Sequence, residues 1–182
     1  MLTEIGFYPS LGFNLLRNLI EPDNWKWCNR INEHIILGAI PFQSMKDDLI
    51  NMQNVGGVVC CTELFELSMA YTSMDKTLWE KEGVRFHNIP MLDFYGSADR
   101  SAILDALAFI DSVVAHGKTV YIHCKAGRTR STTIAACYLI WSKKMSAADA
   151  ITTIQSIRPQ VLLRTNHLAS LEDFEMYTNQ TK

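Results

Sequence analysis

The chain has 182 residues, of which 48% are hydrophobic, and its net charge is −2 at neutral pH. This length and apolar content are typical of one globular domain with a sizeable core. The near-zero charge argues against generic nucleic-acid binding, which needs a broad basic surface. Five cysteines without a framework spacing indicate a reducing compartment. No Cys-x-x-Cys motif or His pair predicts a metal site, and we expect no cofactor.

The amino-terminal segment, residues 1–30, is compatible with three roles. Residues 5–20 are rich in Leu, Phe and Tyr but also contain Pro9, Asn14 and Arg17. This stretch is too short and too polar to span a bilayer, which takes about 20 apolar residues, and it lacks the arginine-rich, acid-poor composition of a transit peptide. A core helix under the sheet, an interfacial helix on a membrane surface and a weak targeting signal all remain open. The main domain is expected to span residues 31–182.

Short β-branched and apolar runs predict strands at residues 34–37, 56–61, 84–89 and 118–122. Helices are expected at residues 45–52, 67–81 and 100–116; the second is polar and partly loop, and the third is amphipathic. Three more helices are expected, from Ser131 to about Trp141, at residues 146–157 with Ser146 as the N-cap, and at residues 166–177. This alternation predicts an α/β fold, with a central, mostly parallel sheet and helices on both faces.

The most informative segment is His-Cys-Lys-Ala-Gly-Arg-Thr-Arg-Ser, residues 123–131, between a predicted strand and a predicted helix. Five residues separate Cys124 from Arg130, a spacing that suits a loop around a phosphate group. Backbone N–H groups of such a loop point inward, and the helix N-terminus adds a positive dipole. Arg130 can hold two phosphate oxygens with its planar guanidinium. The predicted phosphate-binding residues are Lys125, Ala126, Gly127, Arg128, Thr129 and Arg130.

Cys124 is the predicted nucleophile. The helix dipole and Arg130 should lower the pKa of its thiol well below the ordinary value of about 8.5, and the thiolate is the form that attacks phosphorus. Two neighbours are expected to support it: Ser131 by a hydrogen bond to the sulfur, and His123 by ordering the loop and tuning the thiol. A histidine at a strand end is also common as a plain core residue, so both interpretations of His123 stay open.

The reaction also needs an acid that protonates the departing oxygen. Asp93 is the leading candidate, because it follows the strand predicted at residues 84–89 and precedes the helix that begins near Arg100. Asp99 is the rival, although its position beside Arg100 favours a helix N-cap. A plain loop aspartate is the third interpretation. In the expected mechanism Cys124 attacks phosphorus, Asp93 protonates the departing oxygen, and Asp93 then activates the water that hydrolyses phosphocysteine.

The motif resembles the signature of the cysteine-dependent protein tyrosine phosphatase superfamily, in its compact dual-specificity branch. Within that branch it is most similar to the mitochondrial phosphatidylglycerophosphate phosphatases. The similarity outside the loop covers residues 7–9, 29–31, 36–41, 56–59, 147–151 and 157–158, with Trp27 and Glu63. The position of Asp93, 31 residues before Cys124, also matches the place of the acid in that family. Two departures are residues 62–66, where the family carries Asn-Glu-Glu-Tyr-Glu, and Cys28 in place of a tyrosine.

The resemblance implies a single α/β domain that needs no metal and converts phosphatidylglycerophosphate to phosphatidylglycerol in cardiolipin synthesis. It also implies a location at the matrix side of the mitochondrial inner membrane, with the cytoplasm as the alternative. We expect a monomer that contacts a membrane surface and has no nucleic-acid partner.

The choice of substrate stays open. Lys125 and Arg128 favour a highly anionic head group, although they are equally compatible with solvated loop charges. A dual-specificity phosphatase acting on phosphotyrosine or phosphothreonine is the alternative. The intact catalytic set argues against a third function, a phosphate-binding pseudophosphatase. Phe94 and Tyr95 are expected either to line an acyl or glycerol site or to pack the acid loop down.

Cys60 and Cys61 end the second predicted strand, which could lie beside the catalytic strand. Either thiol could form a reversible disulfide with Cys124 under oxidant and protect it from over-oxidation. The simpler interpretation, which we favour, is a pair of small buried hydrophobic residues.

Overall fold

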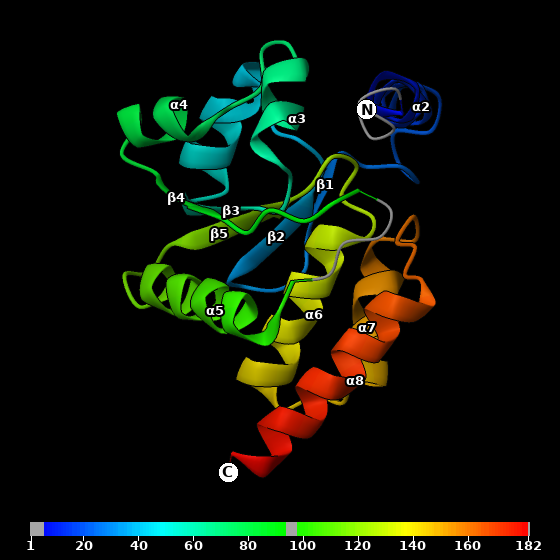
Figure 1. Ribbon diagram of the computed structural model, residues 1–182. Helices are drawn as coiled ribbons and strands as arrows, with labels where there is room; N and C mark the ends of the chain where they lie inside the picture. The colour runs from blue at the N-terminus through cyan, green and yellow to red at the C-terminus, as the bar shows by residue number, and fades with distance from the viewer. Residues whose placement is uncertain (1–5, 94–97, 182) are drawn as a thin grey trace.

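The computed structural model describes residues 6–93 and 98–181 of the chain. It contains a five-stranded sheet in the order β1-β2-β5-β3-β4 (Figure 1). The strands are β1 (Cys28–Arg30), β2 (Ile35–Gly38), β3 (Val55–Cys60), β4 (Arg85–Asn88) and β5 (Thr119–His123). β1 pairs antiparallel with β2, and the other neighbouring pairs are parallel. The predicted α/β fold with a mostly parallel sheet is therefore confirmed.

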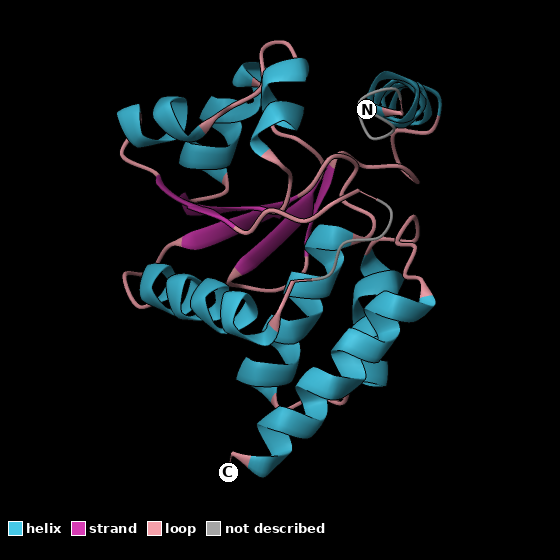
Figure 2. Cartoon of the chain, in the orientation of Figure 1, coloured by secondary structure: helices cyan, strands magenta, loops and turns pink. Residues whose placement is uncertain are grey.

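Helices cover both faces of the sheet (Figure 2). One face carries α5 (Arg100–Val114), α6 (Arg130–Lys143), α7 (Ala147–Ile157) and α8 (Thr165–Gln180). The other carries α3 (Leu64–Met69), α4 (Lys76–Lys81) and two short turns, η1 (Gln43–Met45) and η2 (Asp48–Met52). The larger core lies between β2, β3 and β5 and the first group of helices.

β5 runs through the centre of the sheet, and its five residues are all buried. Alternate side chains enter opposite cores, with Ile122 in the cluster that contains α5 and α6 and Tyr121 in the cluster on the other face. His123, the last residue, is paired with Gly38 of β2 and with Cys60 of β3. Three parallel strands thus end at one edge, where α/β sheets bind ligands, and the chain leaves this edge at Cys124.

The amino-terminal segment forms helix α2 (Phe7–Ile20), which lies at the same end of the molecule as α3 (Figure 1). Its buried residues Phe7 and Leu11 pack in a small cluster with Ile40 and Leu67. Among the described residues, no helix is both long enough and apolar enough to cross a membrane.

Two local predictions need correction, and one strand was not predicted. The expected helix at residues 45–52 is a short 3₁₀ turn followed by one π-helical turn. The expected helix at residues 67–81 is two six-residue helices, because Thr72 has a left-handed φ of 65° and Asp75 begins α4 by capping Leu78. The sequence pattern also misses β1, an edge strand of three residues that is too short to show a period. The other elements agree with prediction to within three residues at each end.

Candidate active site

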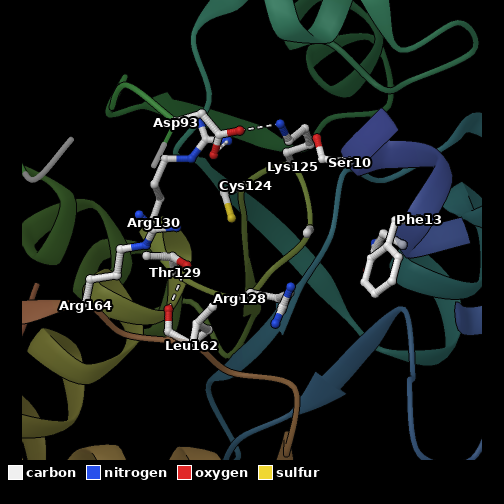
Figure 3. A pocket seen from close by; sticks show the side chains of 12 residues that line it. Ser10, Phe13, Asp93, Cys124, Lys125, Arg128, Thr129, Arg130, Leu162 and Arg164 are labelled. Carbon is white, nitrogen blue, oxygen red and sulfur yellow. Dashed lines mark hydrogen bonds and ion pairs between the residues drawn. The ribbon is translucent and has the colours of Figure 1, made fainter. Parts of the chain in front are cut away.

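The predicted phosphate loop follows β5 and ends where α6 begins (Figure 3). The loop passes close to β2 at Gly127. The φ of Gly127 is +65°, and a Cβ at this position would lie 2.4 Å from the Gly38 carbonyl. A side chain would therefore be both conformationally strained and sterically excluded, so glycine is required for the loop to pass here.

Arg158, at the end of α7, braces the loop from behind. Its Nε donates to the Gly127 carbonyl at 2.7 Å and one Nη donates to the Ala126 carbonyl at 3.1 Å. The other Nη reaches Asn29 Oδ1 at 2.7 Å, so the same guanidinium also holds β1. These two carbonyls face Arg158. The N–H groups of the same peptides therefore face the opposite side of the loop, where they can bind an anion. This role of Arg158 was not predicted, because no local sequence pattern indicates which residues a buried arginine will contact.

Cys124 is buried at the base of the loop, and Ser131 Oγ donates a hydrogen bond to its sulfur at 3.2 Å. Burial by itself would raise the pKa of the thiol. The positive charge of Arg130, the Ser131 hydrogen bond and the backbone N–H groups of Ser131 and Arg128 outweigh it, so the pKa of Cys124 lies below its ordinary value. The site therefore favours a thiolate.

Arg130 is fixed by a residue that the sequence reasoning did not include in the site. Glu66 of α3 accepts two hydrogen bonds from the guanidinium, at 2.6 Å and 3.0 Å, and both side chains are buried. The Met91 carbonyl accepts a third at 3.0 Å. Glu66 belongs to the segment, residues 62–66, in which this chain departs from the family pattern. Its distance from Arg130 along the sequence does not predict that the two residues pair. The bidentate geometry holds the guanidinium plane in one orientation.

Asp93 lies over the loop, where its carboxylate pairs with Lys125 and, at 3.1 Å, with Arg130. It lines the same pocket as Cys124. Asp99 is elsewhere: its side chain accepts the Ala102 N–H at 2.8 Å and caps α5, as its sequence position favours. Position thus separates the two candidate acids and leaves Asp93 in the pocket that contains Cys124.

His123 lies behind the loop, where its Nδ1 is 3.4 Å from the Cys124 carbonyl oxygen. Burial lowers the pKa of His123 to about 4, so the ring is neutral at physiological pH. The neighbouring strand β3 does lie beside β5, and the Cys61 N–H donates to the His123 carbonyl at 2.8 Å. Burial raises the pKa of Cys60 to about 11 and that of Cys61 well above its ordinary value. Both side chains therefore remain protonated, as expected for small core residues.

A pocket of about 110 Å³ opens above Cys124. Of the predicted site residues it brings together Asp93, Cys124, Lys125, Ala126, Arg128, Thr129 and Arg130, whereas Gly127, His123 and Ser131 support the loop from outside its lining. Arg164 and Leu162 line the pocket from the segment before α8, and Ser10, Phe13 and Asn14 line it from α2. Phe94 and Tyr95 lie outside the described residues. Among the described residues, no group of three or more His, Cys, Asp or Glu side chains is placed to hold a metal.

Comparison with known proteins assigns the chain to a family. The model of the dual specificity phosphatase catalytic domain matches residues 49–177. The chain belongs to the dual specificity phosphatase family. Its predicted family and enzyme class are thereby confirmed, and the chain is a cysteine-dependent phosphatase.

This dual specificity phosphatase has relatives along most of its length. It is 36% identical over 171 residues to phosphatidylglycerophosphate phosphatase PTPMT2 of Arabidopsis thaliana, an alignment that covers 94% of this chain and 72% of the relative. It is 32% identical over 174 residues to human phosphatidylglycerophosphatase and protein-tyrosine phosphatase 1, covering 95% and 86%. The crystal structure of PTPMT1 in complex with PI(5)P matches with a TM-score of 0.81 at 30% identity, covering 86% of this chain and 99% of that one.

Proposed function

We propose that this phosphatase removes the terminal phosphate of phosphatidylglycerophosphate and releases phosphatidylglycerol for cardiolipin synthesis. The observation that carries the proposal is the mixed lining of the pocket. Lys125 and Arg128 of the catalytic loop and Arg164 before α8 bring positive charge to the pocket, while Phe13 and Leu162 contribute apolar surface to it. A head group with one phosphomonoester and one phosphodiester, joined to acyl chains, matches cations beside apolar side chains. The Arabidopsis and human relatives, which are named for phosphatidylglycerophosphatase activity, support the same substrate.

In the first step the Cys124 thiolate attacks phosphorus, the bond from phosphorus to the glycerol oxygen breaks, and Asp93 gives its proton to that oxygen. An entering phosphate competes with the Asp93 carboxylate for Lys125 and Arg130, and the released carboxylate takes up a proton from solvent before it acts as the acid. Arg130, oriented by Glu66, and the loop N–H groups stabilise the negative charge on the equatorial oxygens.

In the second step Asp93 takes a proton from a water molecule that attacks the phosphocysteine. The bond from phosphorus to sulfur breaks, inorganic phosphate leaves, and Cys124 returns as a thiolate. The hydrogen bond from Ser131 stabilises this departing sulfur. His123, neutral and behind the loop, is assigned a positioning role through the Cys124 carbonyl.

The lipid substrate and the family resemblance together support action at the matrix side of the mitochondrial inner membrane. The catalytic unit is assigned to the expected range 31–182 together with β1 (Cys28–Arg30), which pairs with β2, and the segment before β1 packs on it through α2.

Phosphate release from phosphatidylglycerophosphate and from a phosphotyrosine peptide tests the proposal. We expect kcat/KM for the lipid to exceed that for the peptide by about a hundredfold or more, since remote binding energy from the head group and acyl chains is absent with the peptide. Cys124→Ser should abolish both activities. Asp93→Ala should lower kcat by a factor of about 10² to 10⁴.

Preference for the peptide would overturn the lipid assignment and favour a protein phosphatase. If the wild-type protein releases phosphate from neither substrate, the pseudophosphatase interpretation is favoured instead. Asp99→Ala is the matched control for the acid, because Asp99 caps α5 and does not line the pocket; its kcat should stay near the wild-type value.

A further inference from the structure

Helix α2 exposes an apolar face to solvent. Successive residues of a helix are about 100° apart, and the exposed large side chains of α2 share one side of it. They are Tyr8, Phe13, Leu15, Leu16, Leu19 and Ile20, and Leu19 is 78% exposed. The other exposed residues of the helix are Pro9 and Gly12. This side carries no charged group. Single exposed apolar residues are ordinary, but a continuous patch marks a surface that meets another phase or partner.

The polar side chains of the same helix point the opposite way. Asn14 is buried and its Oδ1 accepts the Trp25 Nε1–H at 2.7 Å. Asn18 donates to the Trp25 carbonyl at 2.8 Å, and the Arg17 guanidinium lies 4.6 Å from the Trp25 ring centre. A helix on the surface of a water-soluble domain normally has its polar side outward. The reversed arrangement in α2 indicates that its outer side belongs in an apolar environment.

This apolar face is continuous with the catalytic pocket. Ser10, Phe13 and Asn14 of α2 line the pocket that contains Cys124. The ring of Phe7 lies 5.4 Å from Lys125 Nζ, so the helix also contacts the phosphate loop. A surface that binds the outer side of α2 therefore also meets the mouth of the pocket.

Cations mark the border between the apolar face and the pocket. Arg17 of α2 and Arg128 of the loop lie over the same indole, that of Trp25, at 4.6 Å and 5.1 Å from its ring centre; Arg17 is also paired with Glu21 at 2.8 Å, so Arg128 is the stronger cation of the two. Apolar side chains bordered by arginines are complementary to a bilayer with anionic head groups, in which cations pair with phosphates and apolar residues enter the acyl boundary.

We propose that α2 is an interfacial helix whose outer face enters an anionic lipid bilayer and holds the catalytic pocket at the lipid surface. This inference rests on the proposed lipid substrate, and it adds the surface from which that substrate reaches the loop. The 14 residues of α2 span about 21 Å, less than the apolar thickness of about 30 Å, so the helix lies along the interface instead of crossing it.

Vesicle binding by the full chain tests the proposal. The variant Leu16→Asp/Leu19→Asp places two charges on the outer face without touching a residue that lines the pocket. We expect it to bind phosphatidylglycerol-containing vesicles at least about tenfold more weakly than wild type. Its hydrolysis of p-nitrophenyl phosphate, a soluble substrate, should remain within about twofold. The matched control is Met52→Asp/Tyr71→Asp, which changes two exposed apolar residues away from α2 and should bind like wild type.

A reporter keeps the test independent of folding defects. In Leu19→Trp the new indole should be quenched by lipids brominated in the acyl chain, whereas the indole of Tyr71→Trp should not. Equal vesicle binding by wild type and the Leu16→Asp/Leu19→Asp variant would overturn the proposal. The proposal would also be overturned if the wild-type protein is a dimer and the variant is a monomer that binds vesicles equally well, because the apolar face would then be a dimer interface. If the face binds vesicles but phosphatidylglycerophosphate is not hydrolysed, the docking surface stands and the proposed substrate fails.

Discussion

At Cys124 two opposing effects act on one thiol. Removal from water raises the free energy of the thiolate, while Arg130, Ser131 and the loop N–H groups lower it by more. The neighbouring thiols provide a comparison within the same core. Cys61 and Cys137 are equally buried, but the effects that lower their pKa, the charge of Arg130 at Cys61 and a backbone hydrogen bond at Cys137, do not outweigh burial, so the pKa of each lies well above its ordinary value. Placement at the helix N-terminus, and not burial, therefore distinguishes the reactive cysteine.

Ser131→Ala should raise the pKa of Cys124, since this hydrogen bond stabilises the thiolate. A shift of about one unit corresponds to the usual strength of a hydrogen bond to a charged group. Alkylation by iodoacetamide, followed against pH, should show its midpoint moved upward, so that less thiolate is present at a given pH below it. Thr133→Ala is the control, because Thr133 Oγ1 donates to the Thr129 carbonyl and not to the sulfur. An unchanged midpoint in Ser131→Ala would show that the observed contact does not tune the thiol.

At the scale of elements, the active site is assembled by contacts between helices and loops far apart in the chain. The Glu66–Arg130 pair joins α3 on one face of the sheet to the start of α6 on the other. Arg158 joins the end of α7 to the phosphate loop and β1. In each case a buried guanidinium is satisfied by several acceptors, which offsets the cost of removing it from water.

Glu66→Gln should lower kcat/KM for every phosphomonoester by about ten- to a hundredfold, because Arg130 loses the anion that fixes its plane. Inhibition by inorganic phosphate should weaken in parallel. Steady-state kinetics with p-nitrophenyl phosphate measures the effect apart from lipid binding.

Glu80→Gln on α4 is the matched control. The Glu80 carboxylate is exposed, and its ion pair with Lys76, at 3.8 Å, lies on the surface. A Glu66→Gln enzyme that folds normally and keeps wild-type kcat/KM would contradict the assigned positioning role.

For the whole molecule, the central strand couples folding to pH. His123 ends β5 and is buried as a neutral ring, because burial lowers its pKa to about 4 from an ordinary value of 6.5. Between these values the unfolded chain binds a proton that the folded chain does not. The free energy of unfolding therefore falls as the pH falls from 6.5 toward 4.

We expect this single group to reduce the free energy of unfolding by about 2 kcal/mol between pH 7 and pH 5. Urea unfolding at the two pH values measures the difference. His123→Gln should flatten the dependence, whereas His116→Gln, an exposed site, should leave it unchanged. An identical pH dependence in wild type and His123→Gln would refute the assignment to this ring.

The parts of the fold that the sequence predicts are those with a local physical cause. β5 and α6 are strongly apolar, and Ser146 has the chemistry of an N-cap, which the structure confirms by its bond from the Asp149 N–H. The long helix expected at residues 67–81 is interrupted at Thr72, whose φ is left-handed, and the next residue, Ser73, forms a bridge with Phe42, a contact across the chain. Propensity over a window does not include such contacts.

The sequence by itself determined the chemistry of this protein. The spacing from Cys124 to Arg130, between a strand and a helix, is local, and covalent geometry together with the helix dipole makes it a phosphate loop. Only the tertiary structure decided what surrounds that loop: Glu66 on Arg130, Arg158 behind the loop, Asp93 instead of Asp99 over it, and α2 at its edge with its apolar side outward. Each of these depends on packing between segments far apart in the chain, and no period or motif encodes such contacts.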